Sequence, residues 1–286
     1  MMRNTQLWLI GANRQINLQD PAQSYYLQPD IEGLTGLPSI RTSEGINVGR
    51  DGGWTGPQNY DPRFIAVPIM IAHPDVAIVE VRRRDLMTLL AEKRLMLKYV
   101  TEGGSTYTSK IVVMDAPAPL QKLLTRVNMK INLKADDPLL YDFVSTGGGL
   151  IATLNVRRPS GGFEINFTLP LEITGGSEST GVANTGASTV SPIITLYGPL
   201  HQPKVVNMTT NQQMQILTDL AVGDIVIINT ALETITLNGT DVYYLKSEES
   251  QFIDIGPGTN KMYLTSDQTG DTGYAEIKFN SGYIGI

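Results

Sequence analysis

The sequence predicts a mainly β protein with one α-helix in the first half of the chain. Three stretches predict this class. Only Val81 to Val100 has a helical spacing of leucines, whereas Arg126 to Lys134 alternates apolar and polar residues and Thr234 to Leu245 has the pattern of a tight hairpin. Nearly all of the remaining chain has the composition of short strands and turns.

The helix is expected over Val81 to Val100, a stretch rich in good helix formers and free of Gly and Pro. Asp85 is the expected N-cap, because its carboxylate can accept hydrogen bonds from free backbone N–H groups at the start of a helix. The face expected to be buried holds Leu86, Leu89, Leu90 and, more loosely, Leu97. Such a helix would cover one face or one end of a mostly antiparallel sheet.

Strands are expected both before and after this helix. Phe64 to Ala72 is a short apolar run typical of a buried strand, and Val76 to Val81 is expected to continue it after a turn at His73-Pro74. In Arg126 to Lys134, Val127, Met129, Ile131 and Leu133 face one side and Asn128, Lys130, Asn132 and Lys134 the other.

A long connection precedes these strands. Arg41 to Gly56 contains five glycines and is expected to be an extended loop or arm, not a packed element. A connection of this length without structure of its own is uncommon in a compact domain. It therefore suits an arm that wraps an adjacent subunit.

A domain boundary is expected at Ala135 to Gly149, which ends in a glycine run, giving domains 1–145 and 146–286. Residues 1–145 hold 16 Lys and Arg against 15 Asp and Glu, whereas residues 146–286 hold 6 against 13. The two halves thus carry about +1 and −7, which suggests separate modules. A second half this acidic is not expected to bind nucleic acid.

The second half is expected to be a β-sandwich. Leu150 to Val156 and Phe163 to Ile173 are expected strands on either side of a turn, and Ile225 to Ile228 is apolar throughout, which predicts a strand buried on both faces. Gly175 to Thr189 is expected to be a mobile loop. Further short strands are expected at Pro192 to Tyr197, Lys204 to Met208, Met214 to Leu217, Lys261 to Leu264 and Tyr274 to Phe279.

The hairpin at Thr234 to Leu245 is the strongest local prediction. Asn238-Gly239 supplies the two positive-φ residues of a type I′ turn. The resulting register places Ile235 opposite Val242 and Leu237 opposite Thr240.

Composition limits the environment of the protein. The chain has no Cys, which excludes disulfides and thiolate metal sites and fits a reducing cytosol. We expect no signal peptide and no membrane span, because no apolar run approaches about 20 residues. No cofactor or metal site is expected.

The sequence contains no recognisable catalytic motif. His73 and His201 are expected to be structural, and the adjacent carboxylates Asp136-Asp137 point opposite ways on an extended chain. Trp54, Tyr60, Tyr243 and Tyr244 could stack on sugars, but core packing is the favoured interpretation. The residues alone thus indicate a non-enzymatic, two-module, mostly β protein for binding or assembly.

Two stretches resemble a known family. The pattern in the second half is carried by Gly223, Asp224, Asn229, Thr230, Asn238, Gly239, Gly256, Pro257, Gly258 and Asn260. The pattern at the end of the first domain consists of Ala135, Asp137, Pro138 and Tyr141. From about Pro62 onward the chain resembles the distal tail proteins of siphophages, the Sipho-tail family; the first sixty residues match only loosely.

The resemblance implies a homohexameric ring built by the first domain, followed by a galectin-like β-sandwich. It implies a structural virion protein, not an enzyme, located at the phage tail tip and assembled in the host cytoplasm. The implied partners are the tail tube protein, hub and tape-measure proteins, and baseplate or receptor-binding proteins, with DNA passing through the ring without sequence-specific contacts. No catalytic, metal or cofactor residues follow from it, and ligand-binding residues stay undefined.

Two other classes stay open. One is a carbohydrate-binding receptor-recognition protein of the tail tip, in which the sandwich makes the functional contact. The other is a tail tube or baseplate component at a different position. The host, the surfaces that form the ring, and the roles of the first 60 residues and of loop 175–189 are not settled by the sequence.

Overall fold

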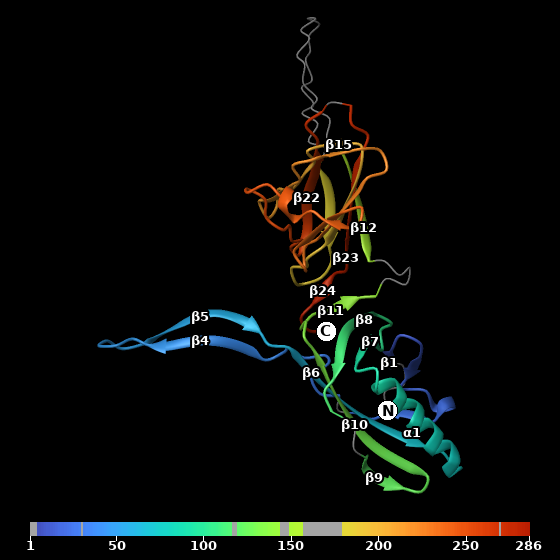
Figure 1. The fold of residues 1–286 in the computed structure, drawn as a ribbon. Helices are drawn as coiled ribbons and strands as arrows, with labels where there is room; N and C mark the ends of the chain where they lie inside the picture. Colours follow the sequence, from blue (N-terminus) through green and yellow to red (C-terminus); the bar gives the residue numbers. More distant parts are fainter. Residues whose placement is uncertain (1–4, 30, 116–118, 144–148, 157–178, 269) are drawn as a thin grey trace, which may run out of the picture. The chain divides into compact units, whose positions relative to one another are not determined.

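The computed structural model describes residues 5–29, 31–115, 119–143, 149–156, 179–268 and 270–286. The chain divides into two compact units, Met1–Phe143 with Tyr283–Ile286, and Val144–Gly282. The last four residues thus return to the first unit. In the described part of the chain, strands dominate and α1 is the single α-helix, so the predicted fold class is confirmed (Figure 1).

Unit 1 is built on a ten-stranded sheet whose main path runs β2-β1-β7-β8-β10-β6-β3, with β9, β11 and β24 joined at its sides. A separate pair, β4 and β5, forms its own two-stranded sheet. The elements are β1 (Gln6–Ile10), β2 (Gln15–Asn17), the 3-10 helix η1 (Pro21–Gln23), β3 (Tyr25–Leu27), β4 (Ile40–Ile46), β5 (Gly53–Tyr60), β6 (Arg63–Ala72), α1 (Val76–Leu90), β7 (Arg94–Val100), β8 (Thr106–Val113), β9 (Pro119–Leu123), β10 (Arg126–Ala135), β11 (Leu140–Asp142) and β24 (Gly282–Tyr283).

The centre of this sheet is the long antiparallel pair of β6 and β10, in register from Arg126 opposite Ala72 to Ala135 opposite Arg63. Both strands bury every second residue, as their alternating sequences require. The strands predicted at Phe64 to Ala72 and at Arg126 to Lys134 are therefore confirmed.

The helix lies five residues earlier than predicted and is shorter. Asp75, not Asp85, is the N-cap, because its Oδ1 accepts a hydrogen bond from Ala77 N at 2.9 Å. The expectation that Val76 to Val81 continues the preceding strand is thus wrong, since these residues are helical.

The second part of the predicted helix is strand β7. The chain leaves the helix through a turn in which Lys93 has a φ of 65°, a left-handed conformation that stops helix propagation. Beyond it, Leu95 and Leu97 are buried alternately with exposed neighbours, a period of two. Leu97 is thus buried as predicted, but from a strand.

The face of α1 that is buried is the predicted one. Leu86, Leu89 and Leu90 pack with Val79 into the core of unit 1. The core residues contributed by the strands include Leu7, Leu9, Ile65, Val67, Ile69, Ile71, Val127, Met129, Ile131 and Leu133. The helix thus stabilises the sheet by covering the apolar sides of its central strands.

Unit 2 is a β-sandwich of a six-stranded sheet, β12-β23-β14-β19-β20-β21, and a four-stranded sheet, β13-β22-β16-β17. Each sheet buries one face, as alternation along its strands requires. The elements are β12 (Leu150–Asn155), β13 (Thr180–Asn184), β14 (Ile193–Tyr197), β15 (Leu200–His201), β16 (Lys204–Asn207), β17 (Gln212–Gln215), β18 (Asp219–Leu220), β19 (Ile225–Asn229), β20 (Thr234–Leu237), β21 (Thr240–Asp241), the 3-10 helix η2 (Tyr243–Leu245), β22 (Gly258–Thr265) and β23 (Tyr274–Phe279).

The type I′ hairpin is confirmed. Asn238 and Gly239 both have positive φ, 51° and 84°, and Leu237 lies opposite Thr240. Val242 N donates to Ile235 O at 2.9 Å, which completes the predicted register. The chain then turns into η2, so Tyr243 and Tyr244 are not strand residues; both are exposed, and the expected core packing is wrong for them.

Strand β19 corrects the prediction for Ile225 to Ile228. Val226 and Ile228 are buried, but Ile225 and Ile227 are exposed, so only one face of the strand is covered. The apolar run reflects a β-branched preference for strands and does not report two covered faces. Of the predicted mobile loop Gly175 to Thr189, residues 180–184 form strand β13. The predicted strand Phe163 to Ile173 lies outside the described residues.

Among the described helices, none is long and apolar enough to cross a membrane.

Candidate assembly surface

Residues 40–60 form a two-stranded hairpin, so the segment predicted at Arg41 to Gly56 as an extended loop or arm is an arm with strand structure of its own. Strands β4 and β5 pair from Ile40 opposite Tyr60 to Ile46 opposite Gly53, with a register shift after Thr42. Figure 1 shows the pair as an arm of unit 1. We call residues 40–60 the arm.

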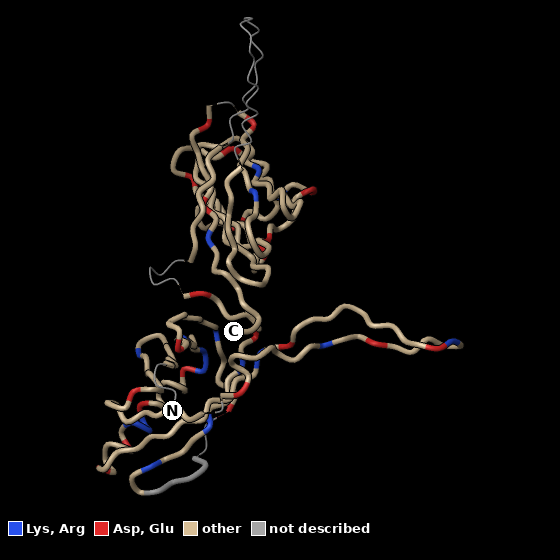
Figure 2. Tube along the Cα trace, turned by 180° about the vertical axis from the view of Figure 1, so that it is seen from behind, with Lys and Arg blue, Asp and Glu red and all other residues tan. Residues whose placement is uncertain are grey.

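The arm exposes apolar side chains that a folded monomer would normally bury. Val48 at its tip is 100% exposed, Ile46 is 85% exposed and Trp54 is 54% exposed. Tyr60 is also exposed, so the core packing expected for Trp54 and Tyr60 is wrong. Charges of both signs are scattered along the arm (Figure 2), so no single charge patch accounts for its exposure.

Trp54 lies flat on the arm because glycines leave room for its indole. A Cβ placed on Gly45, the residue opposite Trp54, would lie 2.6 Å from the indole Nε1, and one on Gly56 would lie 3.4 Å from the indole Cζ3. Gly45 thus cannot accept a side chain without moving the ring, whereas a Cβ on Gly56 would be in ordinary van der Waals contact with it. The arm presents one broad aromatic surface, and an exposed tryptophan of this kind is typical of the residues that dominate interface energies.

The root of the arm is tied to unit 1. Asp61 N donates to Ser39 O at 2.8 Å where the two strands end, and Arg41 Nε lies 3.9 Å from Asp61 Oδ1. Both strands therefore leave the unit from one fixed point. No residue of β4 or β5 is buried.

Arg63, two residues beyond the root, is 1% exposed and binds backbone carbonyls only. Its Nη1 donates to Gly33 O, Leu34 O and Gly36 O at 2.9, 3.1 and 2.7 Å, and its Nε donates to Pro138 O at 3.0 Å. Burial lowers the pKa of this guanidinium. Through Nη1 this side chain thus holds the segment before the arm in place, and through Nε it binds the segment that contains Pro138.

The same arginine holds the C-terminal tail. Arg63 Nη2 donates to Ile284 O at 2.5 Å, and Ile286 N donates to Thr35 O at 3.0 Å. Tyr283 Oη donates to Asp142 Oδ2 at 3.1 Å, and its ring meets Tyr107 edge-on at 5.4 Å between centroids. The last four residues are therefore a structural part of unit 1.

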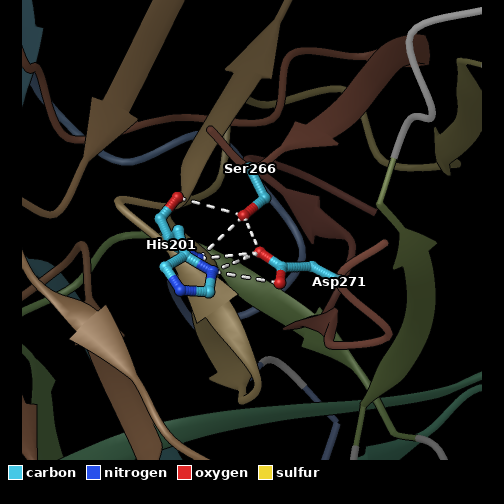
Figure 3. Close-up of polar contacts among 3 residues, drawn as sticks. All are labelled: His201, Ser266 and Asp271. Atoms are coloured by element: carbon cyan, nitrogen blue, oxygen red, sulfur yellow. Dashed lines mark hydrogen bonds and ion pairs between the residues drawn. The ribbon is translucent and has the colours of Figure 1, made fainter. Parts of the chain in front are cut away.

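The cluster of His201, Ser266 and Asp271 has the residue types of a hydrolase triad (Figure 3). Asp271 Oδ1 lies 3.0 Å from His201 Nδ1, but Ser266 Oγ bonds to the Asp271 carboxylate and to His201 O, not to the imidazole. A nucleophilic serine needs the ring as its base, so this connectivity does not activate Ser266.

The cluster instead joins strand β15 to the segment after β22. His201 N donates to Ser266 Oγ at 2.8 Å and to Asp271 Oδ2 at 2.9 Å. Burial would raise the pKa of Asp271, but the hydrogen bonds from Ser266 and His201 outweigh it and lower that pKa. His73 makes a local bond of the same kind, its Nδ1 accepting from Asp75 N at 3.0 Å. The absence of a catalytic site stays a prediction.

The residues that carry the family resemblance shape turns. In unit 1, Asp137 Oδ1 accepts from Leu139 N at 3.0 Å, and its Oδ2 accepts from Tyr141 Oη at 2.6 Å. Burial, and then this bond, raise the pKa of Tyr141. Pro138 offers its carbonyl to Arg63.

The motif of unit 2 has the same architectural role. Asp224 accepts from Asn238 Nδ2 at 2.9 Å, while Asn238 Oδ1 accepts from Ile225 N at 3.0 Å, so the hairpin turn is bonded to the preceding turn. Asn260 is fully buried, accepts from Gly256 N at 3.1 Å and donates to Gly256 O at 2.8 Å. Thr230 Oγ1 donates to Pro192 O. These hydrogen bonds fix the turns between the strands of unit 2.

A second surface feature of unit 1 was not predicted. A cleft of about 340 Å³ opens on the side of β6 and β10 that faces away from the core. It is lined by Glu32, Phe64, Ile65, Ala66, Met114, Asp115, Lys130, Asn132 and Leu133. Its lining comes from four separate segments, so no local pattern in the sequence marks it.

The comparisons with known proteins agree with the sequence motifs. Residues 185–283 match the family model described as siphovirus-type tail component, C-terminal domain. The structure of the Dit protein of phage SPP1, described as a paradigm of the hub adsorption apparatus in phages that infect Gram-positive hosts, has a TM-score of 0.65 at 15% identity, over 96% of this chain and 98% of that one.

A chain of the phage P2 baseplate in its activated conformation with Ca has a TM-score of 0.51 at 13% identity, over 96% of this chain and 97% of that one. A chain of the same baseplate with Sr has a TM-score of 0.51 at 13% identity, over 96% of this chain and 98% of that one. No curated protein sequence matches. The predicted resemblance to siphophage distal tail and baseplate hub proteins is thereby confirmed.

Proposed function

From the siphovirus-type tail component domain at residues 185–283 and the fold shared with phage SPP1 Dit, we propose that this chain is the distal tail hub of a siphophage. In this role it joins the tail tube to the tail tip or baseplate and to the receptor-binding apparatus. The observation that carries the proposal is that one phage tail hub fold covers 96% of the chain, both units included.

The hub is a ring of six copies formed by unit 1, with DNA passing through its lumen. The arm supports this part of the proposal. A lone two-stranded hairpin is marginally stable in water, and this one exposes Ile46, Val48 and Trp54. Contact with an adjacent copy would bury these side chains, and head-to-tail contacts between unlike surfaces close into a ring when the rotation fits.

The partners follow from the position of the hub. The ring contacts the tail tube protein and the tape-measure or hub proteins on one side and baseplate or receptor-binding proteins on the other. The protein resides in the virion after assembly in the host cytoplasm, where a chain without Cys is suited to reducing conditions.

A second candidate function rests on the exposed aromatics of unit 2. Tyr243 and Tyr244 project from η2, and on the six-stranded sheet Tyr197 stacks on Tyr274 at 4.6 Å between centroids while donating to Glu276 at 3.1 Å. Aromatic faces beside a carboxylate suit sugar recognition. Binding of unit 2 to defined saccharides on a glycan array, lost in Tyr244→Ala or Tyr274→Ala, would favour this receptor-recognition role.

Gold-labelled antibody against the purified protein tests the hub directly. Applied to virions that carry this chain, it should mark the distal end of the tail, where tube and tip meet. Label distributed along the tail would identify a tube component instead, and label restricted to peripheral fibres would favour the receptor-recognition role.

A further inference from the structure

The cleft on β6 and β10 combines an apolar rim with carboxylates. Phe64 is 56% exposed and Met114 is 48% exposed, and both line the cleft. Glu32 accepts from Lys130 Nζ at 3.1 Å, and Asp115 accepts from Asn132 Nδ2 at 3.5 Å. Within the described part of the chain, the second oxygen of each carboxylate has no hydrogen-bond partner, so the cleft offers an aromatic ring, a thioether and hydrogen-bond acceptors together.

Trp54 on the arm has the complementary chemistry. Its indole lies over Gly45, the residue is 54% exposed, and within the described residues its Nε1–H has no hydrogen-bond partner. Indoles pack well against aromatic rings and thioethers, and their N–H seeks an acceptor when it leaves water. A cleft rimmed by Phe64 and Met114 with carboxylates inside meets each of these needs.

The arm cannot place Trp54 in the cleft of its own chain. Phe64 lies three residues beyond the root of the arm at Asp61, whereas Trp54 lies six residue steps before Tyr60 at the end of β5. At about 3.3 Å per residue, the indole lies roughly 20 Å out along the arm. A Trp54 side chain that enters this cleft must therefore come from another molecule.

We propose that Trp54 on the arm of one copy docks in the cleft of a second copy, between Phe64 and Met114. This rests on the proposed function, since it specifies two unlike surfaces whose contact closes the ring. The contact is head-to-tail: every copy donates an arm and accepts one, so neither surface is left over in a closed assembly.

Complementation between two variants tests the contact. Trp54→Ala removes the inserted residue but keeps the cleft, and the double substitution Phe64→Ala with Met114→Ala removes the rim but keeps the arm. Light scattering behind size exclusion should show that either variant needs at least about tenfold more protein than the wild type to assemble, as for an interface hot spot. Leu124→Ala and Leu232→Ala, which remove exposed side chains elsewhere, should assemble like the wild type.

An equimolar mixture of the two variants is the decisive sample. It should give a one-to-one dimer and nothing larger, because one intact arm meets one intact cleft and the other pair is broken. Rings formed by either variant at wild-type concentrations, or a mixture that stays monomeric, would overturn the contact and leave the proposed hub standing. A monomeric wild type would overturn the ring and the contact together.

Fluorescence supplies an independent readout, because Trp8 and Trp54 are the two tryptophans of the chain. In a Trp8→Phe background, the emission of Trp54 should move to shorter wavelength as the protein assembles, since the indole leaves water. This shift should be absent when Phe64 and Met114 are replaced. A ring that assembles with the emission of Trp54 unchanged would contradict the contact.

Discussion

Arg63 shows how one residue organises unit 1. It is buried, carries a charge, and satisfies that charge with five backbone carbonyls from three separate segments. A charged group buried without a carboxylate is stable only if hydrogen bonds replace its lost contact with water, as these carbonyls do for Arg63. These carbonyls belong to the segment before the arm, to Pro138 and to the C-terminal residues. One side chain therefore holds together three segments that lie far apart in the sequence.

Replacing this residue tests its role. Arg63→Met should lower the free energy of unfolding of unit 1 by at least about 3 kcal/mol, because several buried carbonyls lose their donors at once. Denaturant unfolding of the full chain measures the change. Arg41→Met, at an arginine of the arm whose side chain is 74% exposed, is the matched control and should change stability by no more than about 0.5 kcal/mol. Equal stability of the two variants would mean that the carbonyls find other partners.

Asp271 predicts a pH dependence for unit 2. Its pKa is lowered in the folded state, so the stability that it contributes is present above the unfolded pKa of about 3.9 and is lost as the pH falls through the lower folded value. Asp271→Asn should cost about 1–3 kcal/mol at neutral pH, since the anionic acceptor of His201 N and Ser266 is removed. The gap between variant and wild type in urea unfolding should narrow below about pH 4; a gap that is constant down to pH 3 would contradict this role.

At the scale of elements, the sequence predicts which face of an element is buried better than it predicts the residues at which the element begins and ends. Leu86, Leu89 and Leu90 are buried as expected, although the helix begins at Val76. The periodicity fails at Leu95 and Leu97 because short apolar runs fit both helix and strand, and a left-handed Lys93 decides between them. The Asn238-Gly239 hairpin was predictable because its turn chemistry is local.

The sequence did not predict that the arm is a two-stranded hairpin or that a cleft lies on β6 and β10. The glycines in Arg41 to Gly56 indicate an extended loop or arm but not a paired hairpin, and one of them, Gly45, makes room for the Trp54 indole. The cleft depends on which segments the sheet brings together, and that is a property of topology. Burial of the aromatics was misjudged for the same reason: composition does not tell whether Trp54 packs in its own core or against a partner.

The buried face of α1 can be tested with one charge. Leu89→Asp or Leu90→Asp should prevent folding of unit 1, because an unpaired carboxylate in an apolar core costs several kcal/mol. Val81→Asp, on the same helix but 47% exposed, should fold normally. Circular dichroism and solubility of the three variants distinguish these outcomes. A soluble, cooperatively melting Leu89→Asp protein would show that the helix is not packed as described.

At the scale of the whole molecule, the C-terminal residues Tyr283–Ile286 belong to unit 1, the unit that also contains the start of the chain. We expect each unit to fold on its own core, but a fragment ending near residue 144 lacks Tyr283–Ile286 and so leaves Arg63 Nη2 and Thr35 O without partners. A fragment covering residues 149–282 should be a soluble, acidic monomer with a β-rich spectrum and its own cooperative melt.

Deleting residues 283–286 from the full chain isolates the effect of the tail. The melt of unit 1 should move to lower temperature, because at least three hydrogen bonds to Arg63, Thr35 and Asp142 are lost. The melt of unit 2 should not move, since its core is complete without these residues. Calorimetry resolves the two transitions, and a shift confined to unit 2 would reverse the assignment of the tail.

The central claim is that this chain assembles into a ring of six, and native mass spectrometry of the purified wild-type protein tests it most directly. Six copies of the 31.2 kDa chain should give a single species of six times that mass, about 187 kDa, with negative-stain images showing a ring with an open centre. A species of 31.2 kDa alone, at micromolar protein and across several salt concentrations, would contradict the account.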